Sequence, residues 1–288
     1  MVSDFVAGFW RLRDWAYSDQ ELLAFIEQLL ELGVTSMDHA MVYRSEEVFG
    51  RALALKPSLR EQMQIVSKCG IRPCGFGELG AEKTNYFDSS KAHIIRSVNA
   101  SLKNLRTDHL DLMLLHRPDY LMNVSEVVEA FEELKQAGKV KSFGVSNFSS
   151  SQFALLNSAW PEGLVTNQVE FSPLNLRALE DGTFDQSQAL STPPMLWSCL
   201  AAGQLLSPTD ERGEKVLLTL KSLQLELDAD TVEQVVYAWC RALPCKPKVL
   251  LGSSKIERIR SAVKAESLTM TREQWYSLWE SANGAPVP

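Results

Sequence analysis

Four side chains that can take or give protons stand at or just past the ends of short, strand-like runs in this chain of 288 residues; they are Asp38, Tyr43, Lys68 and His116. The runs have the length and apolar content of buried β-strands. In a parallel barrel the carboxyl ends of the strands meet at one edge. An acid, a phenol, an amine and an imidazole would then share one site, where they could assist a reaction that needs proton transfer.

The composition is that of a globular protein, and it argues against several classes of partner. Hydrophobic residues make up 45% of the chain and charged residues 23%, and the net charge of -7 argues against the basic stripe of a nucleic-acid surface. No apolar run reaches the roughly 18 residues of a membrane span, and no signal peptide is visible. The five cysteines match no zinc pattern. We therefore expect a cytoplasmic protein without a metal, either a monomer or a weak oligomer.

Short strands alternate with helices along the chain, and the expected strands begin at Phe5, Val34, Met63, Leu110, Val140, Leu164, Met195 and Val249. Most of them lack polar alternation, as expected when both faces of a sheet are buried. Eight such units favour an α/β fold, a closed (β/α)8 TIM barrel in a single domain over residues 1–288. The rival is an open doubly wound sheet, but the glycine-rich turn that usually follows its first strand is missing here.

Helices are expected between the strands, over residues 46–55, 90–105, 125–136, 214–227, 231–243, 256–265 and 271–281, with others beginning after Ser18 and near Ser149. Ser18 and Glu21 have the spacing of a capping box. The irregular stretch 171–190 should contain one helix. Two long loops, 69–89 and 201–213, are longer than a compact domain usually needs, which is typical of functional segments.

Six motifs follow one another in a fixed order: Asp38-His39-Ala40-x-x-Tyr43, Ile65-Val66-Ser67-Lys68, Asp111-Leu112-x-Leu114-Leu115-His116-Arg117-Pro118-Asp119, Gly144-Val145-Ser146-Asn147-Phe148, Asn167-Gln168-Val169-Glu170 and Gly252-Ser253-Ser254-Lys255-Ile256-Glu257-Arg258-Ile259. Each motif alone is weak. As an ordered set over nearly the whole chain, they resemble the aldo-keto reductase family, nearest its bacterial monomer-type oxidoreductase branch.

The resemblance implies a catalytic tetrad of Asp38, Tyr43, Lys68 and His116. Tyr43 would give its proton to a carbonyl oxygen while a hydride reaches the carbon. Free tyrosine titrates near pH ~10, and a buried Lys68 ammonium beside Tyr43 would lower the pKa of the phenol. Asp38 would keep Lys68 charged, and His116 would align the carbonyl oxygen.

The resemblance also implies NADPH as the cofactor, with NAD less expected. The implied contacts are Ser146, Asn147 and Gln168 for the nicotinamide carboxamide, Trp197 for the nicotinamide ring, Ser253, Ser254, Lys255 and Arg258 for the adenosine 2′-phosphate, and Trp10 for the substrate pocket, with Ser198 as a further cofactor contact. A hydroxyl pair, a helix N-terminus and an arginine suit a phosphate group. The loop 201–213 could close over the pyrophosphate.

Several of these residues could equally have a purely structural role. Taken alone, 253–258 describes a helix cap with a solvated arginine, and Trp197 or Trp10 could belong to a core. Two features also depart from the family pattern. Arg44 stands where family members usually carry glycine, in a shortened turn, and glycine adopts conformations that arginine resists. The first strand begins so early that the usual N-terminal hairpin has no room.

The expected function is NADPH-dependent reduction of aldehydes or ketones by hydride transfer, with a small carbonyl compound as substrate and no nucleic acid or membrane as partner. One alternative is a cofactor-binding regulatory subunit on the same fold with little turnover, like the potassium-channel β subunits. Another is a metal-dependent barrel hydrolase, although the chain has no His-x-His pair to support it. The sequence does not name the substrate, because loops carry specificity in such barrels.

Overall fold

The computed structural model describes residues 2–75 and 83–288, and its main sheet is a closed barrel of parallel strands in the order β1-β10-β9-β8-β7-β6-β3-β2. These strands are β1 Phe5–Gly8, β2 Ser36–Asp38, β3 Gln64–Cys69, β6 Leu112–Leu115, β7 Phe143–Ser146, β8 Asn167–Glu170, β9 Met195–Trp197 and β10 Lys248–Leu251. The prediction of a (β/α)8 barrel is confirmed, and the doubly wound sheet is excluded. The chain forms two compact units, Met1–Gln168 and Val169–Pro288.

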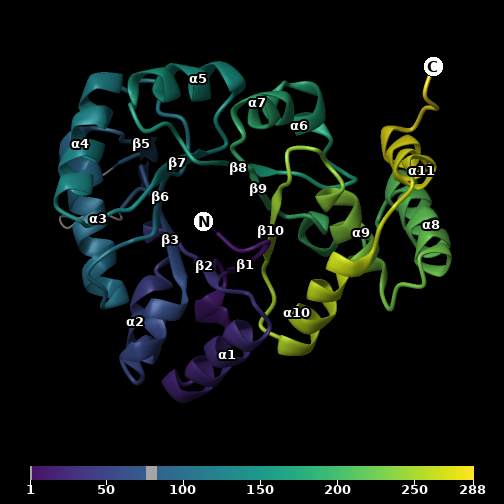
Figure 1. The fold of residues 1–288 in the computed structure, drawn as a ribbon, viewed down its shortest axis with the longest axis horizontal. Coiled ribbons are helices and arrows are strands. Elements are labelled where there is room, and N and C mark those ends of the chain that lie inside the picture. Colours follow the sequence, from purple (N-terminus) through teal and green to yellow (C-terminus); the bar gives the residue numbers. More distant parts are fainter. Residues whose placement is uncertain (1, 76–82) are drawn as a thin grey trace. The chain divides into compact units, whose positions relative to one another are not determined.

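In the first unit, each strand pairs in parallel with the next, as the registers Val6↔Ser36, Asp38↔Val66, Lys68↔Leu114, Leu115↔Val145 and Ser146↔Gln168 show. The helices that follow the strands lie outside them (Figure 1): α1 Asp19–Glu31, α2 Glu46–Leu53, α3 Lys91–Leu105, α4 Val124–Gln136 and α5 Ser150–Ala159. The capping box at the start of α1 is confirmed, because Ser18 accepts from the Glu21 amide and the Glu21 carboxylate accepts from the Ser18 amide.

The expected loop 69–89 contains a small hairpin that the sequence did not reveal. Strand β4, Ile71–Arg72, pairs antiparallel with β5, Tyr86–Phe87. Two-residue strands are too short to produce a readable alternation of apolar and polar positions. Residues 76–82 of this loop lie outside the part of the chain that the structure describes.

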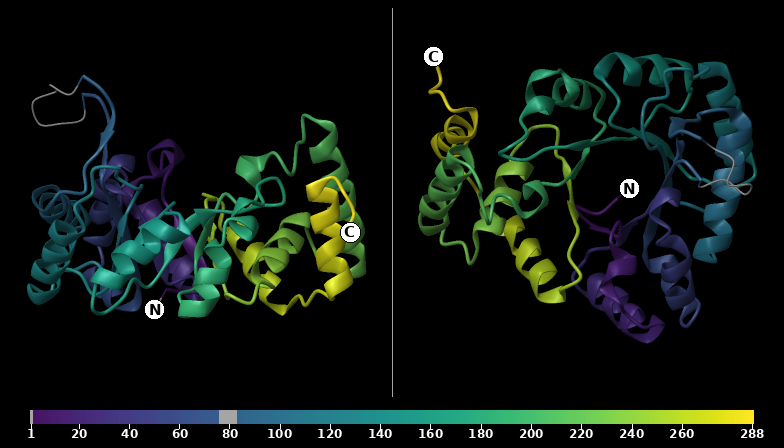
Figure 2. Two further views of the ribbon diagram at one scale, coloured as in Figure 1. Left: turned by 90° about the horizontal axis from the view of Figure 1, so that it is seen from above. Right: turned by 180° about the vertical axis from the view of Figure 1, so that it is seen from behind.

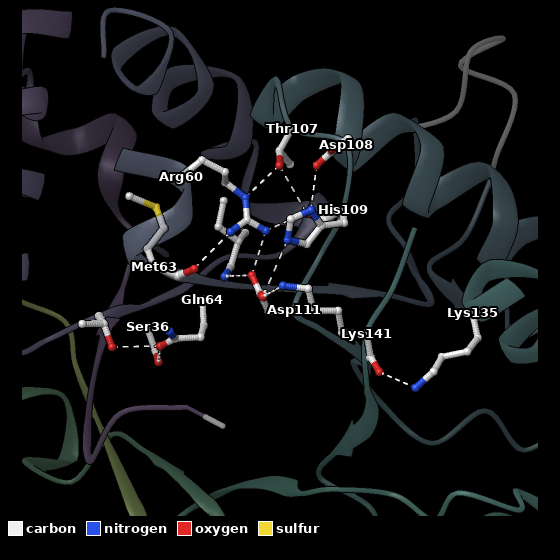
Figure 3. A network of polar contacts seen from close by, with 12 residues as sticks. Ser36, Arg60, Met63, Gln64, Thr107, Asp108, His109, Asp111, Lys135 and Lys141 are labelled. Carbon is white, nitrogen blue, oxygen red and sulfur yellow. Dashed lines mark hydrogen bonds and ion pairs between the residues drawn. The ribbon is translucent and has the colours of Figure 1, made fainter. Parts of the chain in front are cut away.

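A polar network binds together the beginnings of three strands in the first unit (Figure 3). Asp111, just before β6, accepts hydrogen bonds from Arg60 Nη2 at 2.7 Å, the Ile65 amide at 2.9 Å and Lys141 Nζ at 2.8 Å. Burial alone would raise the pKa of Asp111, but these hydrogen bonds and the Arg60 charge outweigh it and hold that pKa below its ordinary value. The carboxylate thus fixes β3, β6 and the segment before β7 relative to one another.

In the second unit, β9 pairs in parallel with β10. The helices are α6 Arg177–Glu180, α7 Thr183–Leu190, α8 Glu211–Glu226, α9 Val232–Arg241, α10 Ile256–Val263 and α11 Arg272–Asn283, and α8 and α11 lie side by side (Figure 2). Two expectations were wrong here. The stretch 171–190 holds two helices, separated at Gly182, whose φ is +80°. Helix α8 begins earlier than expected, because the Asp210 side chain accepts from the Gly213 amide at 2.7 Å and caps it.

Two tryptophans tie α9 to α11. The indole N–H of Trp239 donates to the backbone oxygen of Trp275, and the Trp275 indole donates to that of Trp239, both at 3.0 Å. Their rings stack with centroids 5.1 Å apart. Buried indoles need a polar partner, and here each supplies one for the other.

Within residues 2–75 and 83–288, none of the helices combines the length and apolar character required to span a bilayer. The same residues contain no cluster of three or more His, Cys, Asp or Glu side chains placed to hold a metal ion.

Candidate active site

A buried ion pair forms the base of the candidate site in the first unit. Lys68 Nζ donates to Asp38 Oδ1 at 2.5 Å and to the backbone oxygen of His39 at 2.8 Å, and the two charged side chains are 0% and 3% exposed. Burial alone would lower the pKa of Lys68, but the charge of Asp38 and the neighbouring Tyr43 raise it above its ordinary value. Lys68 therefore stays an ammonium ion, as expected for a partner of Asp38.

Tyr43 lies over this ion pair, in the short 3-10 turn Met41–Tyr43 between β2 and α2. Lys68 Nζ is 5.0 Å from the centroid of the Tyr43 ring. Burial raises the pKa of Tyr43, and this outweighs the lowering by the Lys68 charge. The expected effect of Lys68 is present, but the expectation of a net lowering was wrong, because burial penalises the phenolate more than the ammonium favours it.

His116 faces the Tyr43 hydroxyl, with Nε2 3.4 Å from the phenol oxygen. Burial, followed by the charges of Lys68 and Arg117, holds the pKa of His116 well below its ordinary value. The imidazole is therefore neutral near pH 7, so it can orient a carbonyl oxygen by a hydrogen bond. It does not carry the extra proton of an imidazolium acid.

The three residues expected at the carboxamide form a chain of hydrogen bonds beside the tetrad. Gln168 Nε2 donates to Asp38 Oδ2 at 2.8 Å, and Ser146 Oγ donates to the Gln168 backbone oxygen at 2.9 Å. Asn147 Nδ2 donates to Ser146 Oγ at 2.8 Å and to the His116 backbone oxygen at 3.3 Å. The structure thus brings these three side chains to the strand ends that carry Asp38 and His116.

Trp10 lies beside Tyr43 at the surface and not in the core. Its side chain is 66% exposed, and its ring centroid is 6.5 Å from that of Tyr43. The guanidinium of Arg11 lies 5.7 Å from the Trp10 ring centroid. An exposed indole next to the phenol agrees with a pocket-lining position.

The remaining expected cofactor residues belong to the second unit. Trp197 ends β9, and Ser198 follows it with a φ of +59° and accepts from the Ala202 amide at 3.1 Å. Ser253 Oγ accepts from the Lys255 amide at 3.1 Å. Lys255 occupies the N-cap position of α10 but gives no side-chain cap, and Ser254 precedes it while Arg258 lies in the first turn.

The sequence reasoning missed a second layer of polar residues behind the tetrad. The motifs assigned no role to His39, Ser45, Glu46 or Ser67. His39 is buried and stacks on Phe9 with centroids 4.8 Å apart, and burial lowers its pKa to about 3. The alternation of side chains along a strand could have indicated this layer for His39 and Ser67, because the neighbours of the inward-facing Asp38 and Lys68 must face outward.

The comparisons with known proteins agree with this geometry. The family model described as the aldo/keto reductase family matches residues 4–283. The oxidoreductase YdhF of Escherichia coli is 50% identical over 99% of this chain and 95% of its own, and a 6-dehydroglucose reductase of Agrobacterium fabrum is 38% identical over 99% and 96%. A glycerol dehydrogenase from Gluconobacter oxydans has a TM-score of 0.84 at 23% identity, over 100% of this chain and 94% of its own, and at that identity shows the fold alone.

These matches extend along nearly the whole chain. Members of this family are oxidoreductases that use a nicotinamide cofactor, and carbonyl reduction is their general chemistry. The chain belongs to the aldo-keto reductase family and is an oxidoreductase.

Proposed function

We propose that this protein reduces aldehydes or ketones with NADPH and that Tyr43 delivers the proton. The observation that carries the proposal is the placement of the Tyr43 hydroxyl 3.4 Å from neutral His116, above the buried Lys68–Asp38 ion pair. A neutral phenol and a neutral imidazole can both hydrogen-bond one carbonyl oxygen. We also take residues 1–288 to be a single domain, which the family match over residues 4–283 supports.

NADPH, when bound, supplies the hydride that reaches the carbonyl carbon. A phenol with the ordinary pKa of ~10 is already protonated at neutral pH, and burial raises the pKa of Tyr43 further, so the donor is present before the reaction starts. As negative charge develops on the substrate oxygen, the proton moves to it from the Tyr43 hydroxyl, and a phenolate remains. The Lys68 ammonium stabilises this phenolate by charge, and Asp38 keeps the ammonium in place.

Each unit, taken by itself, offers groups suited to one part of a nicotinamide dinucleotide. The amides of Asn147 and Gln168 and the hydroxyl of Ser146 are groups that bind a carboxamide. In the second unit, the first-turn amides of α10 receive no side-chain cap, which leaves the helix N-terminus suited to a phosphate. Ser253, Ser254, Lys255 and Arg258 stand at that N-terminus, and an arginine there favours a 2′-phosphate. These features support NADPH over NADH. Trp197 remains our proposal for the nicotinamide ring, and Ser198 for a further cofactor contact.

The test is the loss of NADPH absorbance with a panel of aldehydes and ketones. The panel should include 6-dehydroglucose, because that compound names the Agrobacterium relative. We expect Tyr43→Phe to lose turnover by roughly 100-fold to 10,000-fold, while NADPH still binds, as followed by its fluorescence. Turnover retained in Tyr43→Phe would reject the proton-donor assignment. Neither the family match nor the two relatives favour the alternative of a regulatory subunit with little turnover.

A further inference from the structure

We infer that Glu46 is a positioning residue for Tyr43: its buried carboxyl fastens the start of α2 to the back of β3, and so holds the short turn that carries the phenol. The inference rests on the proposed role of Tyr43. It concerns buried side chains that lie behind the Lys68–Asp38 ion pair and that the proposed mechanism does not use.

Two neighbouring strands each present one residue inward and one outward. At the end of β2, Asp38 faces the ion pair, and the next residue, His39, packs against α2 through Phe49, with ring centroids 4.6 Å apart. In β3, Lys68 faces Asp38, and the preceding residue, Ser67, faces α2. This follows from the alternation of side chains along a strand. The outward pair therefore lies directly behind the catalytic pair.

The carboxyl of Glu46 meets this outward layer. Ser67 Oγ donates to Glu46 Oε1 at 2.6 Å, and Asn104 Nδ2 of α3 donates to Glu46 Oε2 at 3.4 Å. Glu46 is 1% exposed, whereas the side chain of the next residue, Glu47, is 74% exposed. Burial raises the pKa of Glu46. Burial of a carboxyl costs free energy unless the group is hydrogen-bonded. The hydrogen bonds of Glu46 behind β3 meet this condition, and an apolar side chain could not make them.

The residue before Glu46 makes a matching contact. Ser45 is the N-cap of α2, a position where serine usually accepts a hydrogen bond from the helix, but here its side chain gives no cap. Its Oγ instead lies 3.2 Å from His39 Nδ1. Both residues at the start of α2 are therefore used to attach the helix to the strand ends beneath it.

Close helix packing keeps these contacts in place. At Gly50 of α2, an added Cβ would lie 2.0 Å from the backbone oxygen of Asn104, so only glycine allows α2 to approach α3 this closely. The approach brings Asn104 within reach of Glu46. The start of α2 is thus held on two sides, by β3 and by α3.

The turn needs this support because it is short and strained. Arg44 directly follows Tyr43 with a φ of +55°, a left-handed conformation that is unfavourable for a residue with a Cβ. Only Arg44 and Ser45 separate the phenol from Glu46. Because so few residues intervene, a shift of the helix start moves the Tyr43 hydroxyl directly.

The experiment compares Glu46→Ala and Ser67→Ala with a matched control, Glu47→Ala, which removes an exposed carboxylate from the next position of the same helix. We expect kcat to fall roughly tenfold to a hundredfold in the first two, as for a small misplacement of a reacting group, with unchanged affinity for NADPH. The double variant Glu46→Ala/Ser67→Ala should lose no more kcat than Glu46→Ala alone, because both substitutions break the same hydrogen bond, the one between Ser67 and Glu46. Glu46→Gln keeps an acceptor for Ser67 and should recover most of the activity.

A second measurement does not depend on turnover. The Tyr43 and Arg44 amides donate to Ala40 and Met41 within the turn. Hydrogen exchange of these amides should be faster in Glu46→Ala than in Glu47→Ala. Equal exchange rates and equal kcat in those two variants would overturn the inference, as would a loss of NADPH affinity that accounts for the whole defect. If Glu46→Ala unfolds at the assay temperature, Ser67→Ala decides the question by the same criteria.

These outcomes separate the inference from the proposed function. If Tyr43→Phe keeps turnover, the proton-donor proposal fails, and the exchange data alone decide whether Glu46 holds the turn. If Tyr43→Phe is inactive while Glu46→Ala and Ser67→Ala behave like Glu47→Ala, the proposed function stands and the positioning role is refuted.

Discussion

Replacement of Asp111 by asparagine should destabilise the protein through the network that joins the beginnings of β3, β6 and β7. The Asp111 side chain is 13% exposed, as is that of Arg60, so their pair is largely protected from solvent. The bond to Lys141 contributes less, because that lysine side chain is 59% exposed. Asparagine keeps one oxygen for the Ile65 amide but leaves Arg60 without a counter-charge. A charge-assisted hydrogen bond is worth about 1.5–3 kcal/mol, so we expect a loss of about 2–3 kcal/mol.

Urea unfolding at several pH values tests both the size and the origin of this effect. The pKa of Asp111 is lowered in the folded state, so its contribution is full above the unfolded pKa of about 4 and is lost as pH falls through the folded pKa. The difference between wild type and Asp111→Asn should therefore be constant near neutral pH and shrink only in acid. Asp108→Asn is the control, because Asp108 is 90% exposed beside the same network. A difference below about 0.5 kcal/mol, or one that persists in strong acid, would refute the reasoning.

Three further predictions concern the site and the helices. Because the pKa of Tyr43 is raised, carbonyl reduction should be nearly independent of pH around neutrality, while alcohol oxidation, which needs the phenolate, should keep rising to pH values above ~10; a plateau in oxidation below pH ~8 would contradict this. Arg106 ends α3 with a φ of +54°, so Arg106→Gly should raise the free energy of unfolding by about 0.5–1 kcal/mol, measured by urea unfolding. Trp275→Phe removes one of the two reciprocal indole bonds and should cost roughly 2 kcal/mol in the same assay, and an unchanged midpoint would show that the Trp239–Trp275 pair is not structural.

Much of the fold could be predicted, because the strands are continuous apolar runs and the helix starts carry explicit caps. The expected starts of α1 at Ser18 and of α11 at Thr271 are both confirmed by capping boxes. The exceptions have local causes. A glycine with positive φ, Gly182, divides a stretch expected to form one helix, and Asp210 caps α8 before its apolar pattern begins.

The positions of the candidate residues at strand ends could be predicted, but their electrostatics could not. Asp38, Lys68 and His116 stand at strand ends that the sequence marks clearly. Whether the pKa of Tyr43 is raised or lowered depends on whether the effect of burial exceeds that of the Lys68 ammonium. The degree of burial is known only from the folded structure. The role of Glu46 was hidden for a similar reason, since a glutamate at a helix start usually faces water and favours the helix dipole.

The alternation at β2 and β3 has a consequence for engineering. Two adjacent pairs, Asp38-His39 and Ser67-Lys68, each combine one residue of the ion pair with one residue that supports the helix behind it. A transplant of the aspartate and the lysine alone into another barrel would transfer the ion pair without the residues that attach the helix behind it. The unit to transfer is both dipeptides together with Ser45 and Glu46, the two residues at the start of α2. A shift of either strand by one position would turn its ion-pair residue outward and its supporting residue inward.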